Sequence, residues 1–255
     1  MQSVVQHIDH CASILRPNTI LLKEAIAALN ATNGGIETYP LCEYVLHSLF
    51  LKMTGAQEQK LKCICWELAC RDYEYRYERY ERERYSECSS YKDKSMVYKD
   101  LIDEIQKREE TFAVDVPLRQ RIIAEWKNEV ETLLEKSLLA ECFKNRYVEY
   151  KQLVASIGHN WIMENGQLLT NKSNVPANER SATCDMALQE MFVKYVYNER
   201  NRAAHNTRSY QHNIPTLRSM TAPEHICQNY FLFLSIMILL DKIYIELFQT
   251  YLSKL

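Results

Sequence analysis

Residues that interrupt regular structure are scarce in this chain, and their scarcity restricts its fold more than any other feature. The 255 residues include only 5 Gly and 6 Pro, which are the strongest local breakers of helices and strands. Ala, Leu, Glu, Lys and Arg, which favour helix, are abundant instead. Because an all-β chain needs many turns, the sequence predicts an all-α fold, a multi-helix bundle with long antiparallel helices.

The net charge and the cysteine content indicate which kinds of partner and which cellular compartment are expected. The formal net charge is −2, whereas proteins that hold long duplexes electrostatically are usually basic. The 9 cysteines are odd in number and irregularly spaced, which favours reduced thiols in a cytoplasmic protein. The first residues lack the pattern of a signal peptide. The longest apolar stretch, Tyr230 to Leu240, is followed by Asp241 and Lys242 and is too short to span a bilayer, so no membrane association is expected.

Hydrophobic residues recur at helical spacing along most of the chain. A boundary between two regions is expected near residue 115, and one continuous domain is the alternative. Loops are expected at 33–35, 159–178 and 207–222. The expected helices are short ones in the first thirty residues broken at Pro17, one at 39–53 ended by Thr54-Gly55, a long one at 57–87, one at 94–110, about forty residues opened by Val116-Pro117, one from Ser181 into residue 205, and a very apolar one at 224–252.

Tyrosine, arginine and glutamate alternate through residues 71–85, within the predicted N-terminal region 1–115. Five Arg balance five acidic residues there, so opposite charges at helical spacing predict a solvated helix that projects or pairs with a partner. A nucleic-acid surface is the alternative, since aromatic rings among arginines stack on bases. The predicted apolar stripe of this helix consists of Leu61, Ile64, Leu68, Tyr73, Tyr77 and Tyr80.

The segment Arg200-Asn201-Arg202-Ala203-Ala204-His205 is the candidate catalytic motif. His205 can exchange a proton near neutral pH, and Arg200 offers a planar cationic fork to phosphate oxygens. RNA carries its own nucleophile, so this pair can promote attack of the 2'-hydroxyl on the adjacent phosphate without a metal. Asn201 is expected to orient the histidine or the local backbone.

Positive charge gathers around the motif. Residues 194–218 carry five cations and one carboxylate, Glu199, for a local charge of +4. Lys194, Arg202 and Arg208 are therefore candidate RNA-binding residues. An ordinary solvated helix C-terminus, where cations are favoured, is the alternative explanation of the same pattern.

Helical geometry complicates a site made by one chain. Residues five apart differ by about 140° around an ideal α-helix. Arg200 and His205 therefore share a face only if the helix ends or bulges between them. The alternative is a twofold dimer in which two motifs meet and build a composite site.

The motif, placed at the end of one amphipathic helix and before a long apolar one, resembles the HEPN superfamily over about residues 116–255. The resemblance implies an HEPN-like helical bundle, a homodimer, and an endoribonuclease of toxin–antitoxin or anti-phage defence systems. Because an unregulated nuclease would be harmful, a controlling regulatory protein or nucleotide ligand is also expected. Two alternatives remain open: a non-catalytic module that binds protein, RNA or nucleotide, and a partner of a nucleotidyltransferase.

Other combinations of residues are weaker candidates. A second Arg–His match, Arg218 to His225, lacks the asparagine and enters a presumed loop. Cys63 and Cys65 point about 160° apart on a helix, so with Cys70 they predict buried thiols and no metal site. His47 is expected to be a partly buried structural histidine. No motif predicts a metal or any other cofactor.

Overall fold

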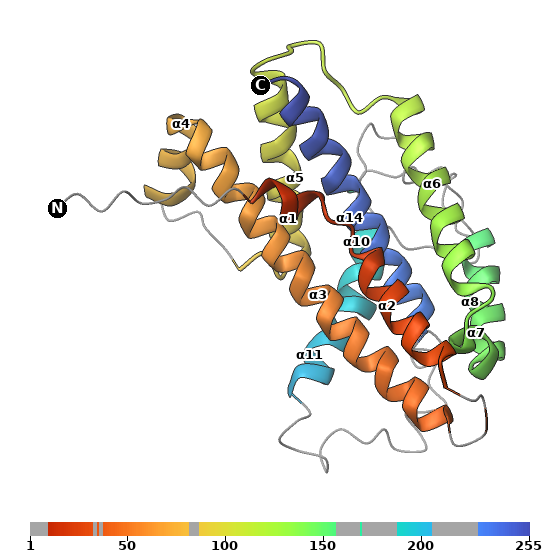
Figure 1. Ribbon diagram of the computed structural model, residues 1–255. Coiled ribbons are helices and arrows are strands. Elements are labelled where there is room, and N and C mark those ends of the chain that lie inside the picture. The colour runs from red at the N-terminus through yellow and green to blue at the C-terminus, as the bar shows by residue number, and fades with distance from the viewer. Residues whose placement is uncertain are drawn as a thin grey trace. The chain divides into compact units, whose positions relative to one another are not determined.

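The computed structural model describes residues 10–32, 35, 38–81, 87–156, 169, 188–205 and 229–255. Helices make up nearly all of these ranges, and none of the residues in them belongs to a β-strand (Figure 1). The predicted all-α fold is therefore confirmed. The helices are α1 (Cys11–Leu15), α2 (Thr19–Asn30), α3 (Thr38–Arg71), α4 (Tyr73–Arg76), the π-helix η1 (Tyr77–Glu81), α5 (Tyr91–Gln106), α6 (Val116–Leu134), α7 (Leu138–Cys142), α8 (Lys144–Ser156), α10 (Leu188–Met191), the π-helix η4 (Phe192–Tyr197), α11 (Asn198–His205) and α14 (Tyr230–Ser253).

Several predicted elements are present. The break at Pro17 separates α1 from α2, and Pro117 stands in the first turn of α6, where Asp115 accepts a hydrogen bond from the backbone N–H of Leu118. A proline is tolerated there because the first turn has no intrahelical use for its N–H. The loops predicted at 159–178 and 207–222 lie outside the described residues, apart from Leu169, as do Asn33, Gly34 and the predicted cap Ser181.

The predicted helix end at Thr54-Gly55 is wrong, because α3 continues to Arg71. Met53, Gln57 and Leu61 are fully buried, so the packed face of α3 passes through this region without a break. Gly55 lies on the exposed side. The cost of one exposed helical glycine is about 1 kcal/mol, which is less than burial of those side chains contributes.

Replacing Gly55 by alanine is expected to stabilise the protein by about 0.5–1 kcal/mol. A Cβ at this position meets no atom within 4 Å, and alanine loses less backbone entropy than glycine on folding. Urea unfolding measures the change. The reverse substitution at the neighbouring position, Ala56→Gly, is expected to destabilise by a similar amount, and an unchanged or lower stability of Gly55→Ala would contradict the expectation.

The single helix predicted for residues 57–87 is also wrong, because the backbone is interrupted at Asp72. That residue is extended, with φ −132° and ψ 113°, and its carboxylate accepts a hydrogen bond from the Tyr75 backbone N–H at 2.9 Å. A new helix therefore starts after Asp72, and different sequence positions face inward on it. Tyr75 is buried, whereas Tyr73 and Tyr77 of the predicted stripe are exposed.

The described residues divide into two compact units, each built from separated segments. Unit 1 comprises Met1–Pro17, Glu58–Phe112 and Tyr244–Leu255, and unit 2 comprises Asn18–Gln57 and Ala113–Ile243. Two long helices, α3 and α14, each contribute a segment to both units. The division into regions 1–115 and 116–255 remains a prediction.

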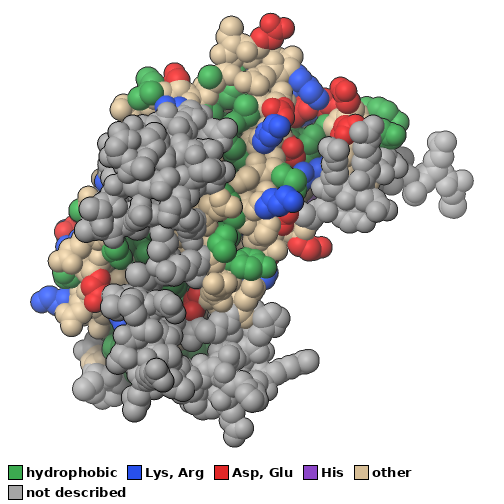
Figure 2. Space-filling model, turned by 180° about the vertical axis from the view of Figure 1, so that it is seen from behind, with side chains coloured by type: hydrophobic (Ala, Val, Ile, Leu, Met, Phe, Trp, Pro, Cys, Tyr) green, Lys and Arg blue, Asp and Glu red, His purple; other side chains and the backbone are tan. Residues whose placement is uncertain are grey.

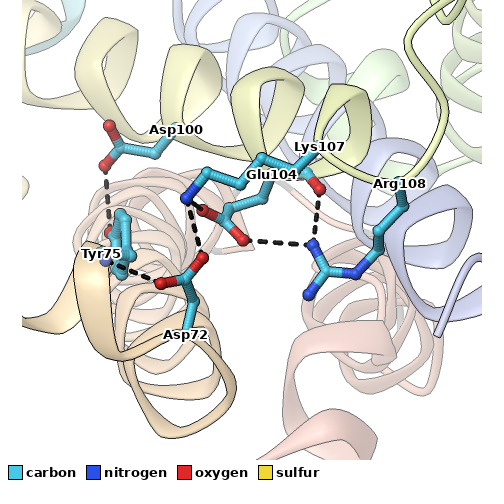
Figure 3. Close-up of polar contacts among 6 residues, drawn as sticks. All are labelled: Asp72, Tyr75, Asp100, Glu104, Lys107 and Arg108. Carbon is cyan, nitrogen blue, oxygen red and sulfur yellow. Dashed lines mark hydrogen bonds and ion pairs between the residues drawn. The ribbon is translucent and has the colours of Figure 1, made fainter.

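An ion network ties helix α5 to the restarted helix in unit 1. The carboxylate of Glu104 is almost fully buried and lies 2.6 Å from Lys107 Nζ and 3.2 Å from Arg108 Nη1. Lys107 also pairs with Asp72 at 2.7 Å. Burial raises the pKa of Asp72, but the hydrogen bonds from Lys107 and the Tyr75 backbone outweigh it and leave that pKa lowered. Figure 3 shows this network, formed by Asp72, Tyr75, Asp100, Glu104, Lys107 and Arg108.

The first half of α14 forms the core of unit 2. Residues 231–240 are all buried, which confirms the prediction that the most apolar helix is central. Its polar groups are satisfied across the core, where Trp126 Nε1 donates to the Ser235 carbonyl at 2.8 Å and Tyr150 hydrogen-bonds the Ser235 hydroxyl at 2.9 Å. A buried Trp or Tyr needs such a partner for its polar atom.

The forty-residue helical pattern that begins at Val116 is divided into three helices. The first ends at Leu134, and the Ser137 hydroxyl accepts from the Ala140 backbone N–H to start α7. Phe143, with φ −111° and ψ 40°, separates α7 from α8. Hydrophobic residues continue at helical spacing across both breaks in the sequence, so periodicity alone does not reveal the breaks.

Charged side chains of both signs are interspersed on the face shown in Figure 2. This mixture agrees with the small net charge of the chain. As far as the described ranges extend, we find no helix that is both long enough and apolar enough to cross a membrane.

Candidate active site

The predicted catalytic motif lies on α11, which continues directly from the π-helix η4. Leu188, Phe192 and Val196 form the inward face of this run, and Glu199 continues it. The carboxylate of Glu199 is therefore directed into unit 2, and Glu199 is only 5% exposed. Arg200 and Asn201 follow at the half-buried edge. π-Helical segments inside longer helices often occur at functional sites.

Arg200 and Asn201 interact with each other. Arg200 Nη1 donates to Asn201 Oδ1 at 3.1 Å, a contact that helps to orient the guanidinium. A guanidinium carries five N–H donors in a rigid fork. The role predicted for Asn201, to orient the histidine or the local backbone, remains a prediction, and the contact found for its side chain is with the arginine.

Glu199 begins a hydrogen-bond chain that links three helices of unit 2. The hydroxyl of Tyr230, the first residue of α14, donates to Glu199 Oε1 at 2.6 Å. The same hydroxyl oxygen lies 3.4 Å from Nδ1 of His47, on α3. The rings of His47 and Tyr230 also pack together, with centroids 4.6 Å apart. The chain Glu199–Tyr230–His47 thus ends on a half-buried histidine.

Aromatic packing fixes the position of Tyr230. Its ring meets Phe50 edge-on at 5.8 Å and Phe233 at 5.5 Å, a geometry that suits the quadrupoles of the rings. Asn229 stands just before α14, where its Oδ1 accepts from the Phe231 N–H and its amide donates to the Arg146 carbonyl. The start of α14 is therefore held by the ring contacts of Tyr230 and by the hydrogen bonds of Asn229.

The other predicted site residues are only partly described. His205 is the last residue of α11, Arg202 lies in its middle and Lys194 lies in η4, but their side chains are outside the described part, as is all of Arg208. The backbone stays α-helical from Asn198 to His205. Positions 200 and 205 are therefore about 140° apart around the helix, and no helix end between them brings both to one face.

Glu199 and Tyr230 were not among the residues predicted from the sequence. A signal for Glu199 was present, because the spacing of Leu188, Phe192 and Val196 extends to position 199 and places a carboxylate on an apolar face. Such a group needs a buried donor. Nothing in the sequence identifies Tyr230 as that donor, since the two residues are 31 positions apart. His47 is half-buried, as expected.

A cavity of about 380 Å³ in unit 1 is a competing candidate site. Its cations are already paired, Lys62 with Glu87 and Arg79 with Asp100. A hydrogen bond with Cys88 and burial raise the pKa of Cys65, so this thiol is a poor nucleophile. We therefore place the candidate site at α11. The cavity is lined by Lys62, Cys65, Trp66, Arg79, Tyr80, Glu87 and Cys88.

The cysteines show no metal-binding arrangement within the described ranges, where no cluster of three or more His, Cys, Asp or Glu side chains is placed to hold an ion. Cys63 and Cys65 are buried free thiols, as predicted, but Cys70 is exposed. In unit 2 the Sγ atoms of Cys42 and Cys142 lie 3.5 Å apart. Burial and this contact raise the pKa of Cys42 to about 11, which keeps it protonated at neutral pH.

Comparison of the chain with protein-family models, with curated proteins and with solved structures finds no match.

Proposed function

We propose that this protein is a metal-independent endoribonuclease that cleaves RNA by attack of the 2'-hydroxyl on the adjacent phosphate. The observation that carries the proposal is the contact of Arg200, which is half-buried, with Asn201, whose Oδ1 accepts from the guanidinium at 3.1 Å. An oriented guanidinium stabilises the charge that develops on phosphate oxygens in the transition state. His205, at the end of the same helix, is assigned to proton transfer.

Lys194, Arg202 and Arg208 supply positive charge around this site in the sequence and are proposed to contact the RNA backbone. The products are a 2',3'-cyclic phosphate and a 5'-hydroxyl. A defence or toxin role in the cytoplasm fits such an activity, since uncontrolled RNA cleavage would arrest growth. A regulatory protein or nucleotide ligand would then hold it in check.

A non-catalytic HEPN-like module that binds RNA, protein, nucleotide or a nucleotidyltransferase partner is the second candidate. The continuous α-helix from Asn198 to His205 favours it, since positions 200 and 205 diverge around the helix. Catalysis by the motif then requires a homodimer with a composite site. The endoribonuclease is therefore expected to cleave RNA when intact motifs from two chains meet, whereas the binding module is not.

Incubation of the wild-type protein and His205→Ala with a mixed RNA pool in EDTA tests the proposal. We expect cleavage by the wild type alone, with cyclic phosphate ends. Equal cleavage by His205→Ala would remove the histidine from the mechanism, and dependence on added Mg²⁺ would contradict the metal-free reaction. RNA binding without cleavage by either protein would establish the binding module instead.

Mixing two inactive variants, Arg200→Ala and His205→Ala, tests the composite site. In a mixed dimer, one composite site combines the two substituted residues and is inactive. The other combines the intact arginine of one chain with the intact histidine of the other. We expect activity to return on mixing, to about a quarter of the wild-type level, since half of the dimers are mixed and each has one intact site. If the motif works within a single chain, mixing restores nothing.

A further inference from the structure

We infer that His47 is the general base of this site, and that Tyr230, which donates to Glu199, orients the imidazole. The inference rests on the proposed function, because the step assigned to His47 belongs to RNA cleavage. It adds a residue from α3, about 150 positions before the motif in the sequence. It also supplies a proton acceptor within the same chain as Arg200.

Hydrogen-bond directions determine which nitrogen of His47 carries the proton. The Tyr230 hydroxyl has one hydrogen, and at 2.6 Å it is donated to the Glu199 carboxylate, which only accepts. The Tyr230 oxygen can then only accept from Nδ1–H of His47, 3.4 Å away. A neutral imidazole protonated at Nδ1 has its basic lone pair on Nε2.

The distances around the Tyr230 hydroxyl indicate the direction of the hydrogen bonds that join His47, Tyr230 and Glu199. The hydroxyl oxygen of Tyr230 lies 2.6 Å from the buried Glu199 carboxylate but 3.4 Å from His47 Nδ1, so the hydroxyl hydrogen is directed at the carboxylate. Phe50 and Phe233 hold the tyrosine ring in place. A base oriented by a hydrogen bond that a third group supports is the usual arrangement for activating a hydroxyl nucleophile.

The chemistry needs two proton transfers. Nε2 of His47 takes the proton of the 2'-hydroxyl, the 2'-oxygen forms a bond to phosphorus, and the bond from phosphorus to the 5'-oxygen breaks. The 5'-oxygen leaves with a proton from His205 or water. Charge on the phosphate oxygens is stabilised by Arg200. The motif alone supplies one histidine per chain, whereas base and acid are separate roles in this reaction.

Single-turnover cleavage of an RNA oligonucleotide by His47→Gln and Tyr230→Phe tests the inference. We expect His47→Gln to lower the rate at least about a hundredfold with an RNA Kd within about threefold of the wild type. Tyr230→Phe keeps the ring packing and removes only the hydroxyl, and about a tenfold loss is expected. The matched control is His10→Gln, a histidine in unit 1, which is expected to cleave at the wild-type rate.

A substrate with a 5'-bridging phosphorothiolate separates base from acid. Its thiolate leaves without protonation, so a variant that lacks the general acid is rescued and one that lacks the base is not. We expect His47→Gln to stay slow on this substrate. Recovery of the wild-type rate would overturn the assignment of His47 as the base.

Long-range ¹H–¹⁵N NMR of the histidine side chains gives a readout that does not depend on activity. We expect neutral His47 to be the Nδ1–H tautomer in the wild type and to shift toward Nε2–H in Tyr230→Phe. An Nε2–H tautomer in the wild type would overturn the proposed positioning. Thermal unfolding of each variant within a few degrees of the wild type confirms that folding is retained.

The outcomes separate this inference from the proposed function. A wild-type protein that cleaves no RNA overturns both. Cleavage that is lost in His205→Ala but unchanged in His47→Gln leaves the endoribonuclease intact and overturns the role of His47. Loss in His47→Gln with the expected tautomer supports the relay from Glu199 through Tyr230.

Discussion

Replacing Arg200 by alanine is expected to lower single-turnover RNA cleavage by about two to three orders of magnitude. Removing one preorganised donor to a developing oxyanion has an effect of this size. Arg200 is half-buried and its guanidinium is already directed by Asn201, so little reorganisation accompanies the reaction. Rates measured with saturating protein and a labelled oligonucleotide give the change in the chemical step without a contribution from binding.

Two further variants distinguish the geometry of Arg200 from its charge. Arg200→Lys keeps the charge but loses the planar fork, and we expect at least about a tenfold loss. Asn201→Ala removes only the orienting acceptor at 3.1 Å and should have a smaller effect. Arg121→Ala, which removes an arginine that is half exposed on α6, serves as the control. A fully active Arg200→Lys would show that charge alone is sufficient.

Replacing Glu104 by glutamine is expected to lower the free energy of unfolding by about 3 kcal/mol. Glu104 is 1% exposed and its carboxylate pairs with both Lys107 and Arg108. Breaking a buried ion pair leaves its partners poorly compensated. The loss falls at the lower end of the usual range because the Lys107 side chain is 43% exposed and keeps its bond to Asp72. Urea unfolding of the two proteins measures the difference.

Glu110→Gln provides the matched control, since this glutamate follows α5 closely and is exposed. A surface substitution of this kind changes stability by less than about 0.5 kcal/mol. Equal stability of Glu104→Gln and the wild type would show that the network in Figure 3 contributes nothing net to folding.

The amino-acid sequence by itself determined the fold class and the position of the core helix. Few breakers and strong helical periodicity are local properties, so they predicted the helices, the break at Pro17 and the start of α6. Composition also located the most apolar helix, and burial of residues 231–240 confirms its central place. Helix ends were less predictable. Gly55 stays helical because neighbouring side chains are packed, and Asp72 ends a helix because its carboxylate caps the next one.

The tertiary structure decided which residues accompany the motif. Arg200 and Asn201 are neighbours in sequence, so their association is a local matter. His47, Glu199 and Tyr230 come from three helices and meet only through long-range packing. A sequence pattern reports which residues face inward, but it does not report which inward faces touch. For that physical reason the motif could be identified from the chain alone, while the hydrogen-bond chain behind it could not.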